Sequence, residues 1–196
     1  MGITKEQIIL TSLKILNRDG IDRLTTRELA KELNIKSASL YWHFKGKQDL
    51  YGAIAEYMCL HSDMPEDMDN PQDYLERTMQ AYRLLLLKVK DSPAIFENSI
   101  PNTPARIAII KVISKKLSEM GVKNENLMTI SNMLNNYVLS FTADEMRYKD
   151  TPPETLRLFN DILDPGITLT ILSPRDFDEQ FLYGLRVLFI GVKESK

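Results

Sequence analysis

The 196-residue sequence has few of the features that disulfide-rich, secreted or membrane proteins need. A lone cysteine, Cys59, cannot form an internal disulfide, which is typical of a reducing compartment. The LLLL run at 84–87 is far shorter than the roughly 20 apolar residues of a membrane helix. The N-terminal MGITKEQ has no basic stretch followed by an apolar segment, so it does not read as a secretory signal. We therefore expect a cytoplasmic protein without a membrane partner.

The common enzyme motifs are also missing. The sequence has no Gly-rich phosphate loop, no HExxH and no nucleophile elbow. Cys59 and His61 are two residues apart and so about 200° apart on a helix, which prevents them from chelating one metal ion or forming a nucleophile–base pair. His61 is also the only histidine after residue 43, so a haem site would lack ligands. We expect no enzyme, no cofactor and no metal site, with a metal-responsive regulator as an alternative.

Charge is distributed unevenly along the chain. The formal net charge is −2. Residues 1–50 contain nine Lys/Arg and six Asp/Glu, or +3, which leaves 16 basic and 21 acidic residues, or −5, for the rest. A basic N-terminal part on an acidic body indicates that the N-terminal end faces phosphates.

The apolar spacing predicts an all-α fold without strands or repeats. Capping boxes at residues 4–7 and 25–28 begin two helices, and Gly20 and Gly121 are helix stops. Thr103 is the predicted N-cap of a helix that has Pro104 at its first position, and the acidic segment 62–73 is the predicted linker. The expected helices are 5–19, 26–33, 37–44, 47–61, 72–90, 104–120, 124–148, about 154–162 and about 174–192.

Three short helices within the first 45 residues have helix-turn-helix proportions. On an α-helical wheel, Leu40 and Phe44 of the third helix face the core, whereas Trp42 faces outward beside Ala38. Two interpretations are open. Trp42 could pack on a later helix, as most tryptophans do, or the third helix could read a DNA major groove with Ser37 and other small residues near the bases.

Residues 24–50, LTTRELAKELNIKSASLYWHFKGKQDL, strongly resemble the DNA-binding head of the TetR family of bacterial transcription regulators. The pattern is closest to the tetracycline-repressor members of that family, and ENSIPNTP, MGVKNEN and FLYGLRVLFIG extend the resemblance into the body. It implies a DNA-binding domain at 1–46 and a ligand-binding and dimerisation domain at 47–196, with 47–61 as the connecting helix. The implied DNA-binding residues, any of which could instead be ordinary surface residues, are Thr26, Arg27, Lys36, Ser37, Ala38, Ser39, Tyr41, Trp42, His43 and Lys47.

The resemblance also implies a small-molecule inducer. The implied ligand-binding residues, of kinds that taken alone more often fill a core than contact a ligand, are His61, Thr78, Tyr82, Phe96, Met133 and Asn136. Phe96 replaces the histidine that binds magnesium in the tetracycline repressors, and Asp63 and Thr78 replace the histidine and asparagine that hold the drug. We therefore expect a more apolar or aromatic inducer than a tetracycline–magnesium chelate.

The last two long helices are apolar around much of their circumference, and Gly184 would permit close helix approach. This pattern favours a homodimer that reads a palindrome, although burial within one subunit would give the same pattern. The overall prediction is a ligand-responsive regulator, most simply a repressor, that binds double-stranded operator DNA. The alternative is a helical protein-interaction module without DNA binding.

Overall fold

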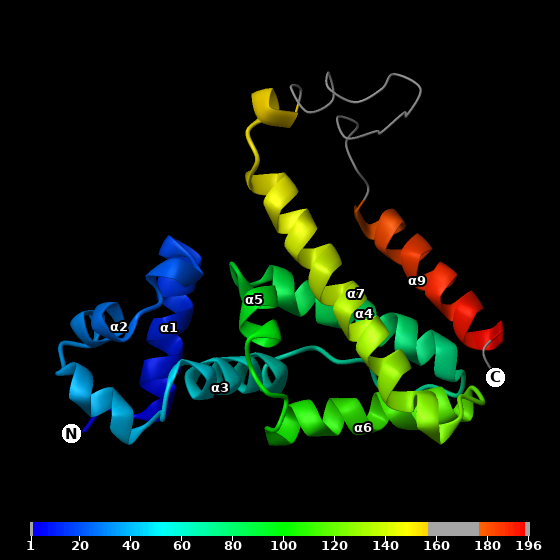
Figure 1. The fold of residues 1–196 in the computed structure, drawn as a ribbon, viewed down its shortest axis with the longest axis horizontal. Coiled ribbons are helices and arrows are strands. Elements are labelled where there is room, and N and C mark those ends of the chain that lie inside the picture. Colours follow the sequence, from blue (N-terminus) through cyan, green and yellow to red (C-terminus); the bar gives the residue numbers. More distant parts are fainter. Residues whose placement is uncertain (1, 157–176, 195–196) are drawn as a thin grey trace.

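The computed structural model describes residues 2–156 and 177–194, and this part of the chain is helical without strands (Figure 1). The elements are α1 (Lys5–Asp19), η1 (Ile21–Arg23), α2 (Thr26–Glu32), η2 (Ser37–Trp42), α3 (Lys47–Leu60), α4 (Pro71–Leu87), α5 (Ser92–Glu97), α6 (Pro104–Glu119), α7 (Asn124–Asp150) and α9 (Phe177–Glu194). The all-α prediction is confirmed. The helix expected near 154–162 and the start of the last helix at 174–176 fall largely outside the described residues.

The N-terminal head consists of α1, η1, α2 and η2, at the left of Figure 1. The predicted capping box at the start of α1 is present, because the Thr4 hydroxyl accepts the Gln7 N–H and the Gln7 side chain accepts the Thr4 N–H. Gly20 ends α1 with φ of +81°, in a region that favours glycine. Buried leucine and isoleucine side chains hold the head together: Ile8, Ile15, Leu16, Leu29 and Leu40.

The turn between α2 and η2 is a Schellman motif with asparagine in the left-handed position. Asn34 has φ of +52°, its N–H donates to the Lys31 carbonyl, and the Ile35 N–H donates to the Ala30 carbonyl. Asparagine tolerates this conformation better than most residues do. The turn therefore ends α2 sharply and leads the chain into η2.

The third helix of the head differs from the prediction. Residues Ser37–Trp42 form a 3₁₀ helix, in place of the α-helix expected over 37–44. The Ser39 N–H donates to the Lys36 carbonyl and the His43 N–H donates to the Leu40 carbonyl, both three residues back. Six residues are too few for the α-helix to gain much from its better hydrogen bonds, and burial of Leu40 and Phe44 against the head is satisfied by the tighter winding.

Helix α3 connects the head to the body, which contains α4–α7 and α9 (Figure 1). The side chain of Asn70 caps α4 by accepting the N–H groups of Gln72 and Asp73, so α4 begins at Pro71, one residue before the predicted start. A helix that the sequence did not predict, α5, occupies Ser92–Glu97, between the expected helices 72–90 and 104–120. Its Ile95 and Phe96 are buried, so packing rather than local propensity stabilises it.

Helices α7 and α9 lie side by side at the C-terminal side of the body. The Tyr137 hydroxyl of α7 donates to the Phe181 carbonyl of α9 at 2.9 Å. A Cβ atom at Gly184 would overlap the ring of Tyr137, so Gly184 permits close approach within one subunit. Within residues 2–156 and 177–194, no helix is both long and apolar enough to cross a membrane.

Candidate DNA-binding surface and ligand cavity

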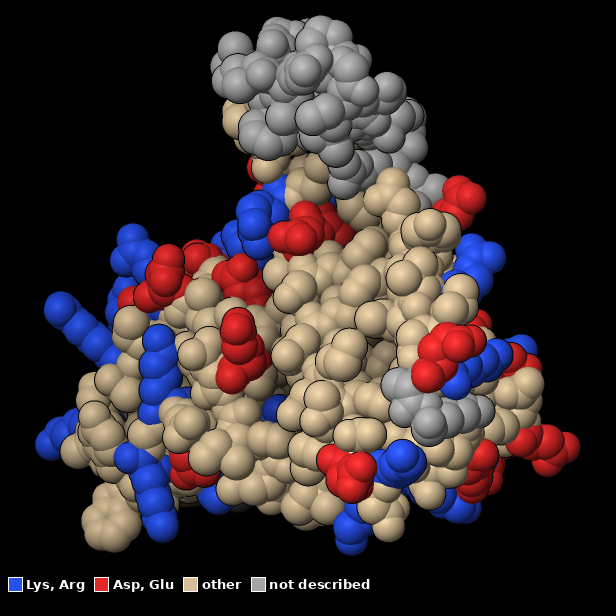
Figure 2. Space-filling view, turned by 45° about the vertical axis from the view of Figure 1, so that its right-hand side comes forward, with Lys and Arg blue, Asp and Glu red and all other residues tan. Residues whose placement is uncertain are grey.

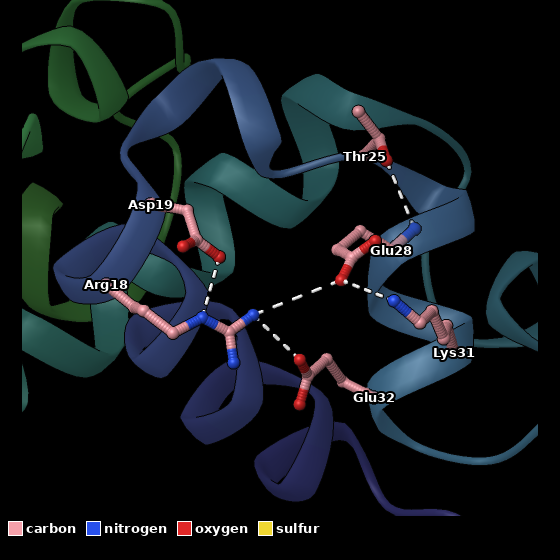
Figure 3. Close-up of polar contacts among 6 residues, drawn as sticks. All are labelled: Arg18, Asp19, Thr25, Glu28, Lys31 and Glu32. Carbon is pink, nitrogen blue, oxygen red and sulfur yellow. Dashed lines mark hydrogen bonds and ion pairs between the residues drawn. The ribbon is translucent and has the colours of Figure 1, made fainter.

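An ion-pair network centred on Arg18 fixes α2 against α1 (Figure 3). The Arg18 guanidinium lies 2.7 Å from Asp19, 2.7 Å from Glu32 and 3.9 Å from Glu28. These carboxylates raise the pKa of Arg18 above its usual value, mainly through the bond to Glu32. The network lies at the surface and adds polar contacts between α1 and α2, whose packing rests on buried residues such as Leu16 and Leu29.

Glu28 belongs to this network and not to a capping box. The Thr25 hydroxyl accepts the Glu28 N–H at 3.1 Å, as predicted. The Glu28 carboxylate, however, lies 3.5 Å from Lys31 and faces Arg18, as Figure 3 shows. Because ion pairing takes the carboxylate, the second capping box that the sequence predicts is formed only by its threonine half.

The predicted DNA-binding residues lie on α2, on η2 and at the start of α3, with α2 packed on η2. Trp42 is 90% exposed and Tyr41 is 60% exposed, whereas Leu40 between the two helices is 3% exposed. Ser39 and His43 are half-buried, and the remaining predicted DNA-binding residues are exposed: Thr26, Arg27, Lys36, Ser37, Ala38 and Lys47. Trp42 does not pack on any later helix of the described chain.

The 3₁₀ winding changes which exposed side chains lie together. With about three residues per turn, side chains three apart are eclipsed. In this winding Tyr41 follows Ala38 by one turn, and Trp42 follows Ser39 by one turn. An α-helical wheel instead aligns Trp42 with Ala38, four residues before it. The exposed surface has two adjacent rows, each with one aromatic and one small residue.

A cavity of about 370 Å³ lies in the body, within the size range of small-molecule sites. Four of the six predicted ligand-binding residues line it: Thr78, Tyr82, Phe96 and Asn136. The other lining residues are mostly apolar and come from α3 to α7, including Cys59, Met64, Met79, Ile109, Ile110, Ile113 and Leu139. The structure thus brings these four predicted residues together at one cavity.

His61 and Met133, the other two predicted ligand-binding residues, lie outside this cavity. His61 follows the last residue of α3 and stacks on Tyr57 with ring centroids 4.1 Å apart. Met133 follows Asn132 by one residue on α7, and this rotation of about 100° carries it to a shallow groove between α7 and α9. Position along the sequence alone did not distinguish these two faces of α7.

Arg106 is a cavity residue that the sequence reasoning missed. Its side chain is buried, donates at 2.8 Å to the Ser99 hydroxyl, and lies over the Phe96 ring, 5.2 Å from the centroid. A single sequence does not show whether an arginine two residues after a helix-starting proline is buried or lies at the surface. Only the fold of the α5–α6 connection brings it into the cavity.

The cavity is otherwise uncharged at neutral pH on its buried side. Burial raises the pKa of the Cys59 thiol to about 11, although nearby Arg106 opposes this shift. Burial likewise raises the pKa of Tyr82 well above its ordinary value. Desolvation lowers the pKa of Arg106. No group of three or more potential metal-ligating His, Cys, Asp or Glu side chains occurs in the described ranges.

Two polar connections join the head to the elements around the cavity. On one side, the Glu56 carboxylate of α3 accepts the Ala105 N–H at 2.9 Å and so caps α6. On the other side, the turn after α4 holds the end of α1, because the Asp91 carboxylate accepts the Ile21 N–H at 2.8 Å and the Lys90 N–H donates to Asn17 at 2.9 Å. These hydrogen bonds connect the turn after α4 to the end of α1, and α6 to α3.

The head presents an exposed short helix on two others and is attached to a helical body with a cavity, which is the arrangement found in helix-turn-helix transcription regulators. Residues 8–54 match the family model of bacterial regulatory proteins of the tetR family. This match covers the N-terminal part of the chain, and together with the similar proteins described next it supports a DNA-binding regulator of the TetR type.

Similar proteins cover nearly the whole chain. The class D tetracycline repressor of Escherichia coli is 26% identical over 194 residues, which are 96% of this chain and 88% of the repressor. The crystal structure of BioQ with its double-stranded DNA operator has a TM-score of 0.76 and 26% identity, covering 97% of this chain and 98% of BioQ. The Streptomyces coelicolor TetR-family protein ActR in complex with actinorhodin has a TM-score of 0.81 and 21% identity, covering 98% and 97% of the two chains.

Proposed function

We propose that this protein is a homodimeric, ligand-responsive repressor that acts in the cytoplasm on palindromic operator DNA. The observation that carries the proposal is the exposed surface of α2 and η2. Arg27 is free to reach a guanine edge, Trp42 and Tyr41 present apolar rings to sugars and thymine methyl groups, and Lys36 and Lys47 reach phosphates on either side. The division into a head at 1–46 and a body at 47–196 is part of this proposal.

A dimer is needed because one short head offers few base contacts, and two heads on a palindrome double them. The exposed apolar side chains of α7 and α9 provide the surface for it: Met133, Tyr183, Val187 and Ile190. Figure 2 shows a broad face of uncharged residues over these helices, whereas Lys and Arg side chains project from the head. Exposed apolar side chains gathered on a face with few charges are typical of an obligate interface.

The proposed inducer is a small, largely apolar or aromatic molecule in the body cavity. Phe96 and Tyr82 meet there with ring centroids 5.5 Å apart, beside isoleucine side chains of α6. An occupant that separates α4 from α6 would act on the head through Glu56 and Asp91. Release of DNA would follow from a change in the spacing of the two heads, since each must fit a fixed half-site.

A mobility-shift titration with intergenic DNA from the region upstream of the gene tests the proposal against a helical interaction module. We expect a discrete complex whose affinity falls steeply as salt is raised, because phosphate contacts release counterions. Absence of a shift at low salt with every fragment would contradict the regulator and favour the module.

A further inference from the structure

The cavity contains a buried positive charge without a negative partner among the described residues. Arg106 is 8% exposed. Its Nη1 donates to the Ser99 hydroxyl at 2.8 Å and to the Ile100 carbonyl at 3.2 Å, and its Nη2 donates to the Phe96 carbonyl at 3.4 Å. All these acceptors are neutral. They hold the guanidinium in position beside the cavity without balancing its charge.

The other buried cations of the described chain are balanced. Arg83 lies 2.7 Å from Glu145 and 2.6 Å from Asp178. Lys116 lies 2.7 Å from Asp67 and 3.4 Å from Glu119. A buried charge costs several kcal/mol unless it is paired, so proteins normally pair such groups, as they do here in these two cases. Arg106 departs from the rule at the one place where a ligand is expected.

The acidic groups near Arg106 are already used or lie in solvent. The Glu56 carboxylate, whose field acts on Arg106, accepts the Ala105 N–H twice, at 2.9 and 3.2 Å. Glu97 lines the cavity but is exposed. Cys59 and Tyr82 remain protonated at neutral pH because burial raises the pKa of each. None of these groups neutralises the guanidinium at close range.

A second polar atom of the cavity is also unused. The Ser131 hydroxyl on α7 is buried and has no hydrogen-bond partner within the part of the chain that the structure describes. An unpaired buried hydroxyl costs about 1–3 kcal/mol, which a ligand oxygen could recover. Arg106 on α6 and Ser131 on α7 thus add two hydrogen-bonding groups to a mostly apolar lining.

We propose that the inducer is an amphipathic organic anion whose carboxylate, or a similar oxyanion, pairs with Arg106 while its apolar body lies among Phe96, Tyr82 and the α6 isoleucines. This inference rests on the proposed ligand-responsive function and narrows the chemical class of its ligand. A guanidinium binds planar oxyanions through two parallel hydrogen bonds. The acceptors that hold Arg106 in position are neutral, so its positive charge remains available to an anionic ligand. Pairing would tie the α5–α6 connection to the ligand and so to the end of α6 that Glu56 caps.

Two fluorescent probes with the same aromatic skeleton test this directly on the full-length protein. 8-Anilinonaphthalene-1-sulfonate carries an oxyanion, and N-phenyl-1-naphthylamine is its neutral counterpart. Fluorescence titrations should show at least tenfold tighter binding of the sulfonate to the wild type. Equal affinity for the two probes, or preference for the neutral one, would overturn the proposal without any variant.

Variants then assign the preference to Arg106. Arg106→Met replaces the charged side chain by a long uncharged one. It should abolish the preference, because the affinity for the sulfonate should fall at least tenfold while the affinity for the neutral probe stays the same. Arg106→Lys should retain part of the preference, and Arg77→Met, an exposed arginine on α4, should change neither probe. A preference that survives Arg106→Met, or equal loss of both probes in a variant that melts like the wild type, would contradict the proposal. If Arg106→Met does not fold, the affinities of the two probes for the wild type and for Arg106→Lys show whether the preference for the anion depends on Arg106.

Operator binding, measured separately by fluorescence anisotropy, distinguishes failure of this inference from failure of the proposed function. A wild type that binds no DNA contradicts the regulator itself. If the wild type binds DNA but does not prefer the anionic probe, only the inference of an anionic inducer is contradicted.

Discussion

Trp42 is the most exposed large apolar side chain of the described residues, and the neighbouring ring of Tyr41 is exposed as well. An indole left in water contributes little to folding, since the free energy of burying aromatic surface is not gained. Leu40, which belongs to the same short helix, is buried and holds η2 to the head. Within a span of three residues, one side chain is thus buried in the head and another is left exposed.

Replacing Trp42 by alanine should weaken operator binding at least tenfold and leave the thermal melting temperature nearly unchanged. Binding is measured by anisotropy and melting by circular dichroism. Leu40→Ala is the control, and it should destabilise the head by about 2–5 kcal/mol because it empties a buried site. A Trp42→Ala variant that melts like Leu40→Ala would show that the indole belongs to the core.

Arg27→Ala should relax discrimination at one base pair of each half-site. A bidentate contact between arginine and guanine contributes about 1–3 kcal/mol of discrimination, and this part alone should disappear. Competition with operator variants changed at single positions measures it. Uniform weakening for all operator variants would show that Arg27 contacts only phosphate.

At the scale of helices, the start of α6 shows how tertiary structure replaces a local signal. The sequence predicts that the Thr103 side chain caps this helix, and Thr103 does occupy the N-cap position. Its hydroxyl is nevertheless buried without a hydrogen-bond partner in the described ranges, and the Glu56 carboxylate accepts the Ala105 N–H in its place. A carboxylate at a helix N-terminus is also favoured by the helix dipole. The cap therefore connects α3 to α6.

The two residues give opposite predictions for stability. Glu56→Ala should destabilise the protein by about 1 kcal/mol, the usual effect of a lost cap, and should uncouple α3 from α6. Thr103→Val should be neutral or stabilising, because it removes an unpaired hydroxyl and keeps the shape of the side chain. Chemical denaturation measures both. If only Thr103→Val destabilised the protein, the Thr103 side chain would be the cap of α6, as the sequence predicts.

The contact of α7 with α9 depends on one glycine. A methyl group at Gly184 would overlap the Tyr137 ring, whose hydroxyl is fixed by the Phe181 carbonyl. We expect Gly184→Ala to destabilise the body by about 1–3 kcal/mol through overpacking. Gly52→Ala on α3 is the matched control, since nothing lies within 4 Å of its added methyl group, and it should be neutral or slightly stabilising. Equal melting temperatures for the two variants would contradict this packing.

Sequence periodicity predicted the long helices well, because their apolar faces repeat over many turns. It failed at α5 and η2, which are six residues each and are stabilised by buried side chains rather than by local propensity. The position of Trp42 on the outside was correct, although the 3₁₀ winding aligns residues three apart rather than the four of an α-helical wheel. Within the cavity, Phe96 and Tyr82 were foreseen from the resemblance, whereas Arg106 and Ser131 depend on how α5, α6 and α7 converge.

At the scale of the whole molecule, the face of α7 and α9 decides whether two heads can act together. Ile190 is 63% exposed on this face. Ile190→Glu should convert the protein to a monomer, as measured by sedimentation velocity, and should weaken operator binding strongly, since a charge would be buried in the interface. Leu84→Glu, at an exposed position of α4, is the control and should remain dimeric. A wild type that sediments as a monomer would contradict the proposed interface.

Selection of bound DNA from a random-sequence duplex library by the wild-type protein is the most direct measurement of what the exposed surface of α2 and η2 does. We expect an enriched inverted repeat whose half-sites are separated by about one helical turn, read by two heads of one dimer. Enrichment of a sequence without two-fold symmetry would contradict the dimeric reading. No enrichment at low salt would contradict DNA binding by this surface altogether.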